Sequence, residues 1–197
     1  SPLASEEQKQ RWLPAIISGE KTMAVGISEP DAGSAATDMR TTAKATTGGF
    51  VLNGTKRWIS NGGEADQYLV YCRLNDEPGA KAIGAVMVEK GAEGFSQGAS
   101  EKLMGFRGIP SADLVFDNVF VPEENLVVPA GGFGKLFGIF SIERLGNTTM
   151  SLAIGQAALD QTLKYVEERE QFGKQLVEFQ SIQVLLADMI LAVEAAR

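Results

Sequence analysis

The sequence of 197 residues contains no histidine and a single cysteine, Cys72. The absence of histidine excludes Ser-His-Asp triads and histidine metal sites, and one cysteine is too few for a zinc site built from thiolates. A single cysteine cannot form an internal disulfide, so a reducing compartment is expected. Because Cys72 lies in an apolar run, we expect it to be a buried thiol of the core.

Basic clusters and long apolar segments are also missing. The sequence has 18 Lys and Arg residues against 25 Asp and Glu residues, a net charge of -7, and no basic stripe that could neutralise the phosphates of a nucleic acid. Charges interrupt every apolar stretch before the roughly 18 to 20 residues that a spanning helix needs, so we expect neither a membrane span nor a signal peptide. The composition, 44% hydrophobic and 22% charged, is that of a globular protein with a core.

The first segment is expected to be a short helix. Ser5 is a suitable N-cap, and Gln8 occupies the capping-box position before a segment that runs to Ile17. The sequence begins without a methionine in this helical pattern and ends at Arg197 within another. We therefore expect it to be part of a longer chain.

From Lys21 to about Val128 the pattern changes to short strands separated by loops rich in Gly, Pro and Asp. The pair Asn53-Gly54 predicts a type I′ hairpin turn, since it supplies the positive φ angles that such a turn requires. Short strands at this spacing favour a barrel or a sandwich. The expected strands are Met23–Ile27, Phe50–Leu52, Thr55–Ser60, Gln67–Arg73, Ala82–Val88 and Ala112–Val121.

From Phe133 onward the apolar residues follow a helical period. They form one face in each of two segments, and Gly173 lies between the segments. Two antiparallel helices joined by a loop are the simplest interpretation. The residues of the two faces are Leu152, Leu159, Leu163 and Val166, and then Ile182, Leu185, Leu186, Met189, Ile190 and Val193.

Two segments of the strand region suit a flat ligand. Residues 25–34 lead from a strand into a turn with a proline and small residues, which exposes backbone N–H groups; an ordinary surface turn is the alternative. In residues 56–63, Trp58 and Ser60 share one face of a strand, so an indole and a hydroxyl would flank a heteroaromatic ring. The alternative is that Trp58 belongs to the core.

Two helical segments carry charged residues beside apolar ones. In residues 140–146, Glu143 and Arg144 interrupt a mostly apolar helix. A carboxylate in apolar surroundings has a raised pKa, which suits a general base; the alternative is a solvated or salt-bridged pair. Residues 167–174, followed by Gln180, by themselves indicate only the polar end of a helix and its loop.

Five motifs, in order, make the sequence resemble the flavin-dependent acyl-CoA dehydrogenase family over nearly its whole length: SEPDAGS, NGTKRWISNGG, LVFDNVFVP, ERLGN and EEREQFGKQLVEFQSIQ. The resemblance implies an α+β multidomain fold. Residues 1–20 would be the last helix of an α-helical N-terminal domain, and residues 21–129 a β-barrel-like middle domain that binds flavin and acyl-CoA. Residues 130–197 would be the first helices of a truncated C-terminal four-helix bundle. The sequence departs from the family at Ala35, where members often have Asp, and at Val25, where several have Tyr.

The resemblance also implies FAD as the cofactor. Ser28 would bond the pyrimidine edge of the isoalloxazine ring, Trp58 would lie beside the ring, and Ser60 would lie at flavin N5. Residues of the last motif would reach the FAD of a neighbouring subunit, which implies a homo-oligomer, usually a tetramer built as a dimer of dimers. The implied cofactor-binding residues are Ile27, Ser28, Gly33, Trp58, Ile59, Ser60, Arg169, Gln171, Phe172 and Gln180.

The implied activity is the α,β-dehydrogenation of an acyl-CoA thioester to the trans-2-enoyl-CoA, with electrons passed to an electron-transferring flavoprotein. Glu143 would be the catalytic base, as in the isovaleryl- and long-chain-type members; most other members carry the base in a later C-terminal loop. Ser34, Ser141 and Arg144 would contact the substrate. The alternatives are a flavoenzyme of the same fold with other chemistry (monooxygenase, oxidase or enoyl-CoA reductase) and an inactive truncated copy. The expected location is the cytoplasm in a bacterium, or the mitochondrial matrix in a eukaryote.

Overall fold

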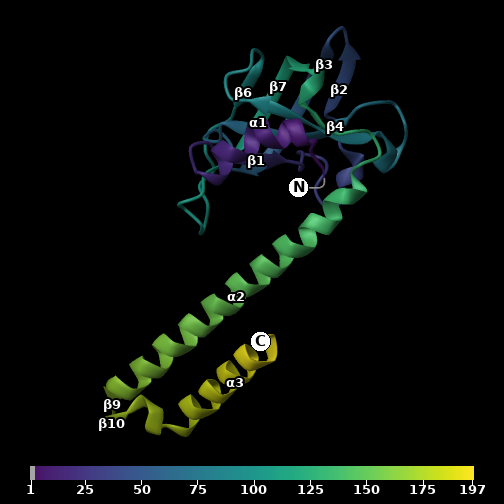
Figure 1. Ribbon diagram of the computed structural model, residues 1–197. Helices are drawn as coiled ribbons and strands as arrows, with labels where there is room; N and C mark the ends of the chain where they lie inside the picture. Colours follow the sequence, from purple (N-terminus) through teal and green to yellow (C-terminus); the bar gives the residue numbers. More distant parts are fainter. Residues whose placement is uncertain (1–2) are drawn as a thin grey trace. The chain divides into compact units, whose positions relative to one another are not determined.

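The computed structural model describes residues 3–197 and divides into two compact units, Ser1–Phe137 and Gly138–Arg197. The first unit holds a short helix and a large sheet, and the second consists mainly of two helices (Figure 1). The expected α+β class is therefore confirmed. No helix in the described part of the chain is both long and apolar enough to cross a membrane.

Helix α1 (Glu6–Ile17) begins as the sequence predicts. The Gln8 N–H donates to Ser5 Oγ (3.2 Å), and the Ser5 N–H donates to Gln8 Oε1 (3.0 Å), which completes a capping box. The Gln8 side-chain amide also donates to the Leu126 carbonyl (2.8 Å), and Trp12 is buried. The helix is therefore anchored to the sheet of the first unit.

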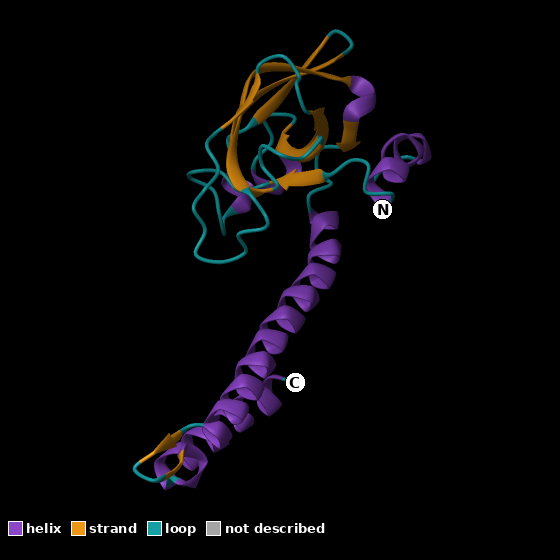
Figure 2. Ribbon diagram, turned by 90° about the vertical axis from the view of Figure 1, so that its left-hand side faces the viewer, coloured by secondary structure: helices purple, strands orange, loops and turns teal. Residues whose placement is uncertain are grey.

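Eight strands form one mixed sheet in the order β6-β7-β3-β2-β4-β5-β8, with β1 parallel to β4. The strands curve strongly around the interior of the unit (Figure 2), but in residues 3–197 the end strands β6 and β8 do not pair, so the expected barrel is not closed. The strands are β1 (Met23–Gly26), β2 (Thr42–Thr46), β3 (Gly49–Ser60), β4 (Gln67–Arg73), β5 (Ile83–Glu89), β6 (Phe95–Gln97), β7 (Ser111–Pro122) and β8 (Leu126–Val128). Three short 3-10 helices connect them, η1 (Ala36–Asp38), η2 (Gly79–Ala82) and η3 (Glu123–Asn125).

The hairpin expected at Asn53-Gly54 is wrong. β3 passes through both residues as one strand, and the tight turn lies earlier, at Thr47-Gly48, where β2 meets β3. Gly54 has a positive φ of 142°, but it lies at a β-bulge opposite β7, where the Asn118 N–H donates to Asn53 Oδ1 (2.9 Å). The conformational freedom that marks a turn in many sequences here serves an irregularity within a long strand.

One apolar cluster forms the core of the first unit. Tyr68 packs edge-on against Phe95, with 4.9 Å between the ring centroids. Cys72 is fully buried, as expected, and burial raises the pKa of its thiol to about 12. Ala24 of β1 and Ile59 of β3 belong to the same cluster, so the core holds both of the strands that lead into the candidate flavin-binding segments.

The second unit is built from two antiparallel helices, as the apolar period predicts. Helix α2 (Gly134–Glu168) begins in the first unit and α3 (Gln180–Ala196) folds back along its C-terminal half, where Arg197 donates to Gln156 Oε1 (2.8 Å). Between them lie β9 (Glu170–Gln171), β10 (Lys174–Gln175) and the 3-10 helix η4 (Leu176–Glu178).

The apolar face of α3 is wider than α2 can cover. Leu186 and Val193 are buried, but Leu185 and Ile190, which the helical period assigns to the same face, are 58% and 42% exposed. Within this unit, the two helices therefore cover only the centre of the predicted face.

Candidate functional site

The first candidate segment is the turn that follows β1. Glu29 and Ala32 exchange two backbone hydrogen bonds (2.9 and 3.2 Å), which close a tight loop. A Cβ at Gly33 would meet no atom within 4 Å, so the backbone there is open to a ligand. The candidate residues flank the loop: Ile27 and Ser28, both half-buried, precede it, and Gly33 and Ser34, both exposed, follow it.

The second candidate segment is the end of β3, where a bulge turns Trp58 outward. Between the pairs Lys56–Leu114 and Ile59–Ala112, β3 contains two residues where β7 contains one. Trp58 adopts a φ of 55°, which bulky residues avoid. Its backbone N–H donates to Asp113 Oδ1 (3.2 Å). The indole is 64% exposed and Ser60 is exposed as well, whereas Ile59 is buried. Within the described residues, Trp58 is therefore not part of the core.

Backbone strain of this kind is informative about the site. A left-handed conformation costs about 1–2 kcal/mol for a residue with a side chain. Such strain persists where the surrounding structure enforces it, often at binding sites. The Arg57 guanidinium lies 5.1 Å from the centroid of the Trp58 ring, an arrangement that restrains the indole by a cation–π interaction.

The structure brings the two segments side by side. The Arg57 N–H donates to the Ser28 carbonyl (2.8 Å), and Lys56 Nζ donates to the Ile27 carbonyl (2.9 Å). Residues almost thirty positions apart in the sequence thus form one surface, with an exposed indole and hydroxyl groups at its edge. This surface suits a flat ring whose edge carries hydrogen-bonding atoms.

Sequence reasoning misses a buried ion pair beneath this surface. Lys56 Nζ lies 2.7 Å from Glu29 Oε1, and both side chains are almost completely buried. Glu29 also accepts the backbone N–H groups of Arg40 (2.6 Å) and Thr41 (3.0 Å). The signal in the sequence is the position of Lys56, four residues after Leu52, which places both side chains on the inward side of an alternating strand.

The two partners of the pair have shifted pKa values. Burial alone would raise the pKa of Glu29, but the charge of Lys56 and the hydrogen bonds to the carboxylate outweigh burial and lower it. Burial lowers the pKa of Lys56, and the attraction of Glu29 opposes this shift. The carboxylate is therefore held in its charged form by its partners rather than by water.

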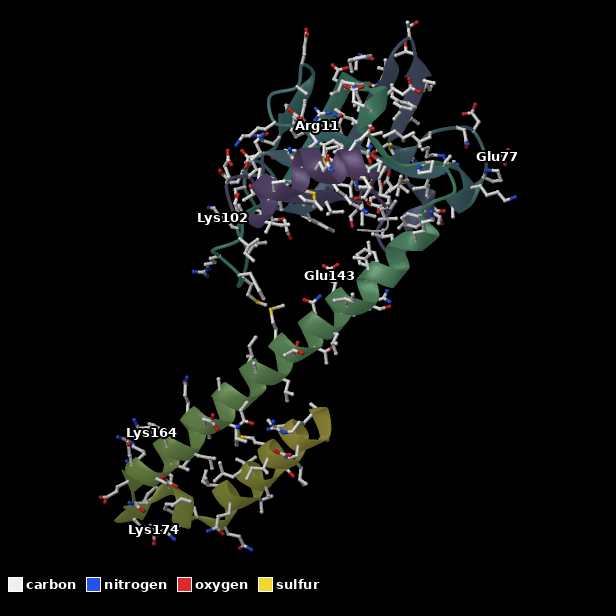
Figure 3. All side chains as sticks on the ribbon, viewed as in Figure 1. Arg11, Glu77, Lys102, Glu143, Lys164 and Lys174 are labelled. Carbon is white, nitrogen blue, oxygen red and sulfur yellow. The ribbon has the colours of Figure 1, made fainter. Side chains whose placement is uncertain are left out.

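The third group of candidates lies on the first part of α2. Glu143 and Arg144 are exposed, and with Phe140 and Asn147 they line a shallow pocket of about 240 Å³ along one face of the helix. The Arg144 guanidinium lies 6.0 Å from the centroid of the Phe140 ring. Figure 3 shows the Glu143 side chain projecting from α2. The second unit by itself does not supply the apolar surroundings expected for this carboxylate. Ser141, the remaining substrate candidate, is exposed on the same stretch.

The fourth group surrounds the β9–β10 hairpin. Phe172 and Gly173 form its turn with φ values of 54° and 78°, and the Phe172 side chain is 95% exposed. Lys174 Nζ lies 4.2 Å from the centroid of the Phe179 ring. Arg169, Gln171 and Gln180 are exposed around the same turn.

The third and fourth groups are far apart in the same unit. At a rise of 1.5 Å per residue, the 25 steps from Glu143 to Glu168 span about 38 Å of α2. Figure 3 shows this separation, since Lys164 and Lys174 lie at the other end of α2 from Glu143. The two groups therefore cannot contact one small ring within a single copy of this unit.

Comparison with known proteins identifies the family. The family model for the acyl-CoA dehydrogenase middle domain matches residues 24–119, and that for the acyl-CoA dehydrogenase C-terminal domain matches residues 130–197. The chain therefore belongs to the acyl-CoA dehydrogenase family. It is 42% identical over 191 residues to the mitochondrial isovaleryl-CoA dehydrogenase of Arabidopsis thaliana. The matched region covers 96% of this chain and 47% of that protein. The chain thus spans about half the length of the curated relatives that it matches.

Solved structures agree with this assignment. An acyl-CoA dehydrogenase from Geobacillus kaustophilus matches with a TM-score of 0.93 at 34% identity, over 97% of this chain and 51% of that chain. The FAD complex of PigA matches with a TM-score of 0.92 at 31% identity, over 98% and 51% of the two chains. The expected cofactor, FAD, is thus confirmed for the family.

The residues of this chain fit an isoalloxazine ring. Trp58 offers an exposed aromatic plane, Ser28 and Ser60 offer hydroxyl donors, and the open backbone at Gly33 allows close approach. No group of three or more His, Cys, Asp or Glu in residues 3–197 is placed to hold a metal ion.

Proposed function

We propose that the complete protein carrying this chain is an FAD-dependent enzyme that dehydrogenates an acyl-CoA thioester between its α and β carbons to give the trans-2-enoyl-CoA. The observation that carries the proposal is the exposed Trp58, held outward by a strained bulge directly beside the Ser28 turn. A chain that only needed a stable core would bury this indole, since burying a large aromatic side chain is strongly favourable.

The residues of the first unit bind and orient the ring. Trp58 lies against it, Ser28 donates a hydrogen bond to its pyrimidine edge, and Ser60 donates one at N5. Ile27, Ile59 and Gly33 supply the adjoining backbone, and Ser34 contacts the substrate arm. When bound, FAD supplies the acceptor for the hydride that leaves the β carbon.

Glu143 removes the proton from the α carbon. Its carboxylate and the Arg144 guanidinium are both exposed on the same part of α2, so both are accessible to a substrate. Arg144, with Ser141, holds the CoA moiety, and Glu143 receives the proton. A positioned carboxylate of this kind typically contributes about a hundredfold to ten-thousandfold to the rate.

The exposed hairpin end completes the FAD site of another copy. Because about 38 Å of helix separates it from Glu143, a role in FAD binding requires that it act on a neighbouring subunit. An almost fully exposed Phe172 in a left-handed backbone conformation is consistent with a residue that is covered on assembly. The proposed assembly is a homotetramer, a dimer of dimers, and the electrons pass on to an electron-transferring flavoprotein.

The proposed function is tested by replacing Glu143→Gln in the full-length protein. The protein is mixed without oxygen with a panel of acyl-CoA thioesters that includes isovaleryl-CoA and butyryl-CoA. We expect the bleaching of the flavin by a substrate of the unmodified protein to slow by at least about a hundredfold in the variant. Binding of the acyl-CoA should be retained.

The matched control is Asp160→Asn, which neutralises an exposed carboxylate further along the same helix. Asp160→Asn should bleach at the rate of the unmodified protein. Bleaching of Glu143→Gln at that same rate would exclude Glu143 as the base. Absence of bleaching by every thioester in the unmodified protein, or consumption of oxygen in place of dehydrogenation, would contradict the proposed function.

A further inference from the structure

The buried pair Lys56–Glu29 joins the two candidate flavin-binding segments, and the proposed chemistry gives it no role. Lys56 belongs to β3 two residues before Trp58, and Glu29 follows Ser28 directly. We propose that the pair acts as a positioning device that holds the Ser28 turn and the Trp58 bulge in the register that an isoalloxazine ring requires. This inference rests on the proposed function.

The contacts of the ammonium group fix the turn at consecutive points. Lys56 Nζ donates to the Ile27 carbonyl (2.9 Å) and to Glu29 Oε1 (2.7 Å), and it also lies 3.8 Å from Met39 Sδ. Between these two points, the Ser28 carbonyl accepts the N–H of Arg57 (2.8 Å). Residues 27, 28 and 29 are thus each tied to β3, so Ser28 cannot move without displacing the strand that carries Trp58.

The carboxylate extends this connection to a third segment. Glu29 Oε2 accepts the Arg40 N–H (2.6 Å), and Glu29 Oε1 accepts the Thr41 N–H (3.0 Å) in addition to Lys56. Both oxygen atoms therefore have partners, as a buried carboxylate requires. Gly26 leaves room for the lysine, because a Cβ there would lie 3.3 Å from Lys56 Cγ.

Stability alone does not account for such a pair. The cost of removing two charges from water is large, and replacing a buried ion pair by uncharged residues of similar size is often neutral or stabilising. An ion pair with directed hydrogen bonds does, however, define positions more strictly than apolar contacts do. The expected loss on its removal is therefore in the fit of the flavin more than in folding.

The test uses the double variant Lys56→Met with Glu29→Gln in the full-length protein, so that neither charge remains buried alone. We expect its dissociation constant for FAD to rise at least roughly tenfold, about 1.4 kcal/mol, and its flavin absorption bands to shift. The control is Val119→Ala, which removes core volume from the same unit near the other end of β3, where Val119 pairs with Leu52. Val119→Ala should lose about as much thermal stability as the double variant, but it should keep the FAD affinity and the flavin absorption spectrum of the unmodified protein.

A second variant, Gly26→Ala, keeps both charges but pushes the lysine stem aside by a few tenths of an ångström. It should raise the FAD dissociation constant by roughly twofold to fivefold, on the scale of tenfold per 1.4 kcal/mol, and it covers the case in which the double variant does not fold. The inference is overturned if the folded variants keep the affinity and spectrum of the unmodified protein, or lose them only as Val119→Ala does. If the unmodified protein retains no flavin, the proposed function fails and this inference fails with it.

Discussion

Replacing Gly54 by alanine tests how the irregular pairing at Gly54, where β7 contains one residue more than β3, supports the site. A Cβ at this position would lie 2.5 Å from Thr41 Oγ1 and 2.7 Å from Thr41 Cα, and the backbone φ is 142°. Forcing a residue with a side chain into such a conformation costs about 1–3 kcal/mol, and displacing the packed threonine costs about 1–3 kcal/mol more. We therefore expect the variant to lose about 2–6 kcal/mol of unfolding free energy, the sum of these two costs.

Gly48→Ala is the matched control, because Gly48 also has a positive φ, 79°, but has no atom within 4 Å of the added Cβ. Its loss should be limited to the backbone cost of about 1–2 kcal/mol. Both variants are compared with the unmodified full-length protein by urea unfolding, followed by circular dichroism. The difference between the two losses measures the close approach of Thr41.

The effect of Gly54→Ala should reach the flavin site through Thr41, whose N–H donates to Glu29. We expect Gly54→Ala to release FAD more readily than Gly48→Ala, as measured by the fluorescence of free flavin during dilution. Equal stability losses and equal FAD retention in the two variants would refute the reasoning, since the contact with Thr41 would then constrain neither the fold nor the site.

The remaining predictions concern the bulge at Trp58 and the subunit interface. Asp113→Ala removes the acceptor of the Trp58 backbone N–H (3.2 Å), so the flavin absorption spectrum should shift. The free energy of unfolding, measured by thermal unfolding, should fall by only about 1 kcal/mol. An unchanged spectrum would mean that the Trp58 bulge does not need this hydrogen bond. Arg169→Ala should lower FAD affinity and oligomer stability together, because each supports the other by linkage, and FAD titration with sedimentation at several dilutions measures both. Loss of FAD from an unchanged assembly would count against a shared site.

Local signals in the sequence predict much of the fold but fail where tertiary contacts decide. The capping box of α1 and the period of α2 and α3 depend on neighbours within a few residues, and they are found as expected. The prediction of a hairpin at Asn53-Gly54 is wrong because the same residues also suit an irregularity within a strand. Only the pairing with β7 decides between a turn and such an irregularity. The strand Thr42–Thr46 is missed because its polar and small residues give no strong alternation.

The candidate site shows the same division. Alternation at the end of β3 correctly places Trp58 and Ser60 on one face of the strand and Ile59 on the other. It does not predict the positive φ of Trp58, which arises from an unequal number of residues in two paired strands. The pair Lys56–Glu29 is also missed, because a buried charge is recognisable only when the residue that neutralises it is known to lie nearby.

The pairing of β3 with β7 has a consequence for the time at which the first unit can fold. β4 and β5 are neighbours in the sequence and pair as a hairpin, but β3 must wait for β7, which lies beyond β4, β5 and β6. At a synthesis rate of about 5–20 residues per second, β7 leaves the ribosome several seconds after β3. During this interval the apolar strands β4 and β5 have no complete sheet to cover them. β5 also pairs with β8, so these strands stay without their full set of partners until Val128 has emerged, and until then the nascent chain exposes apolar strands that favour aggregation.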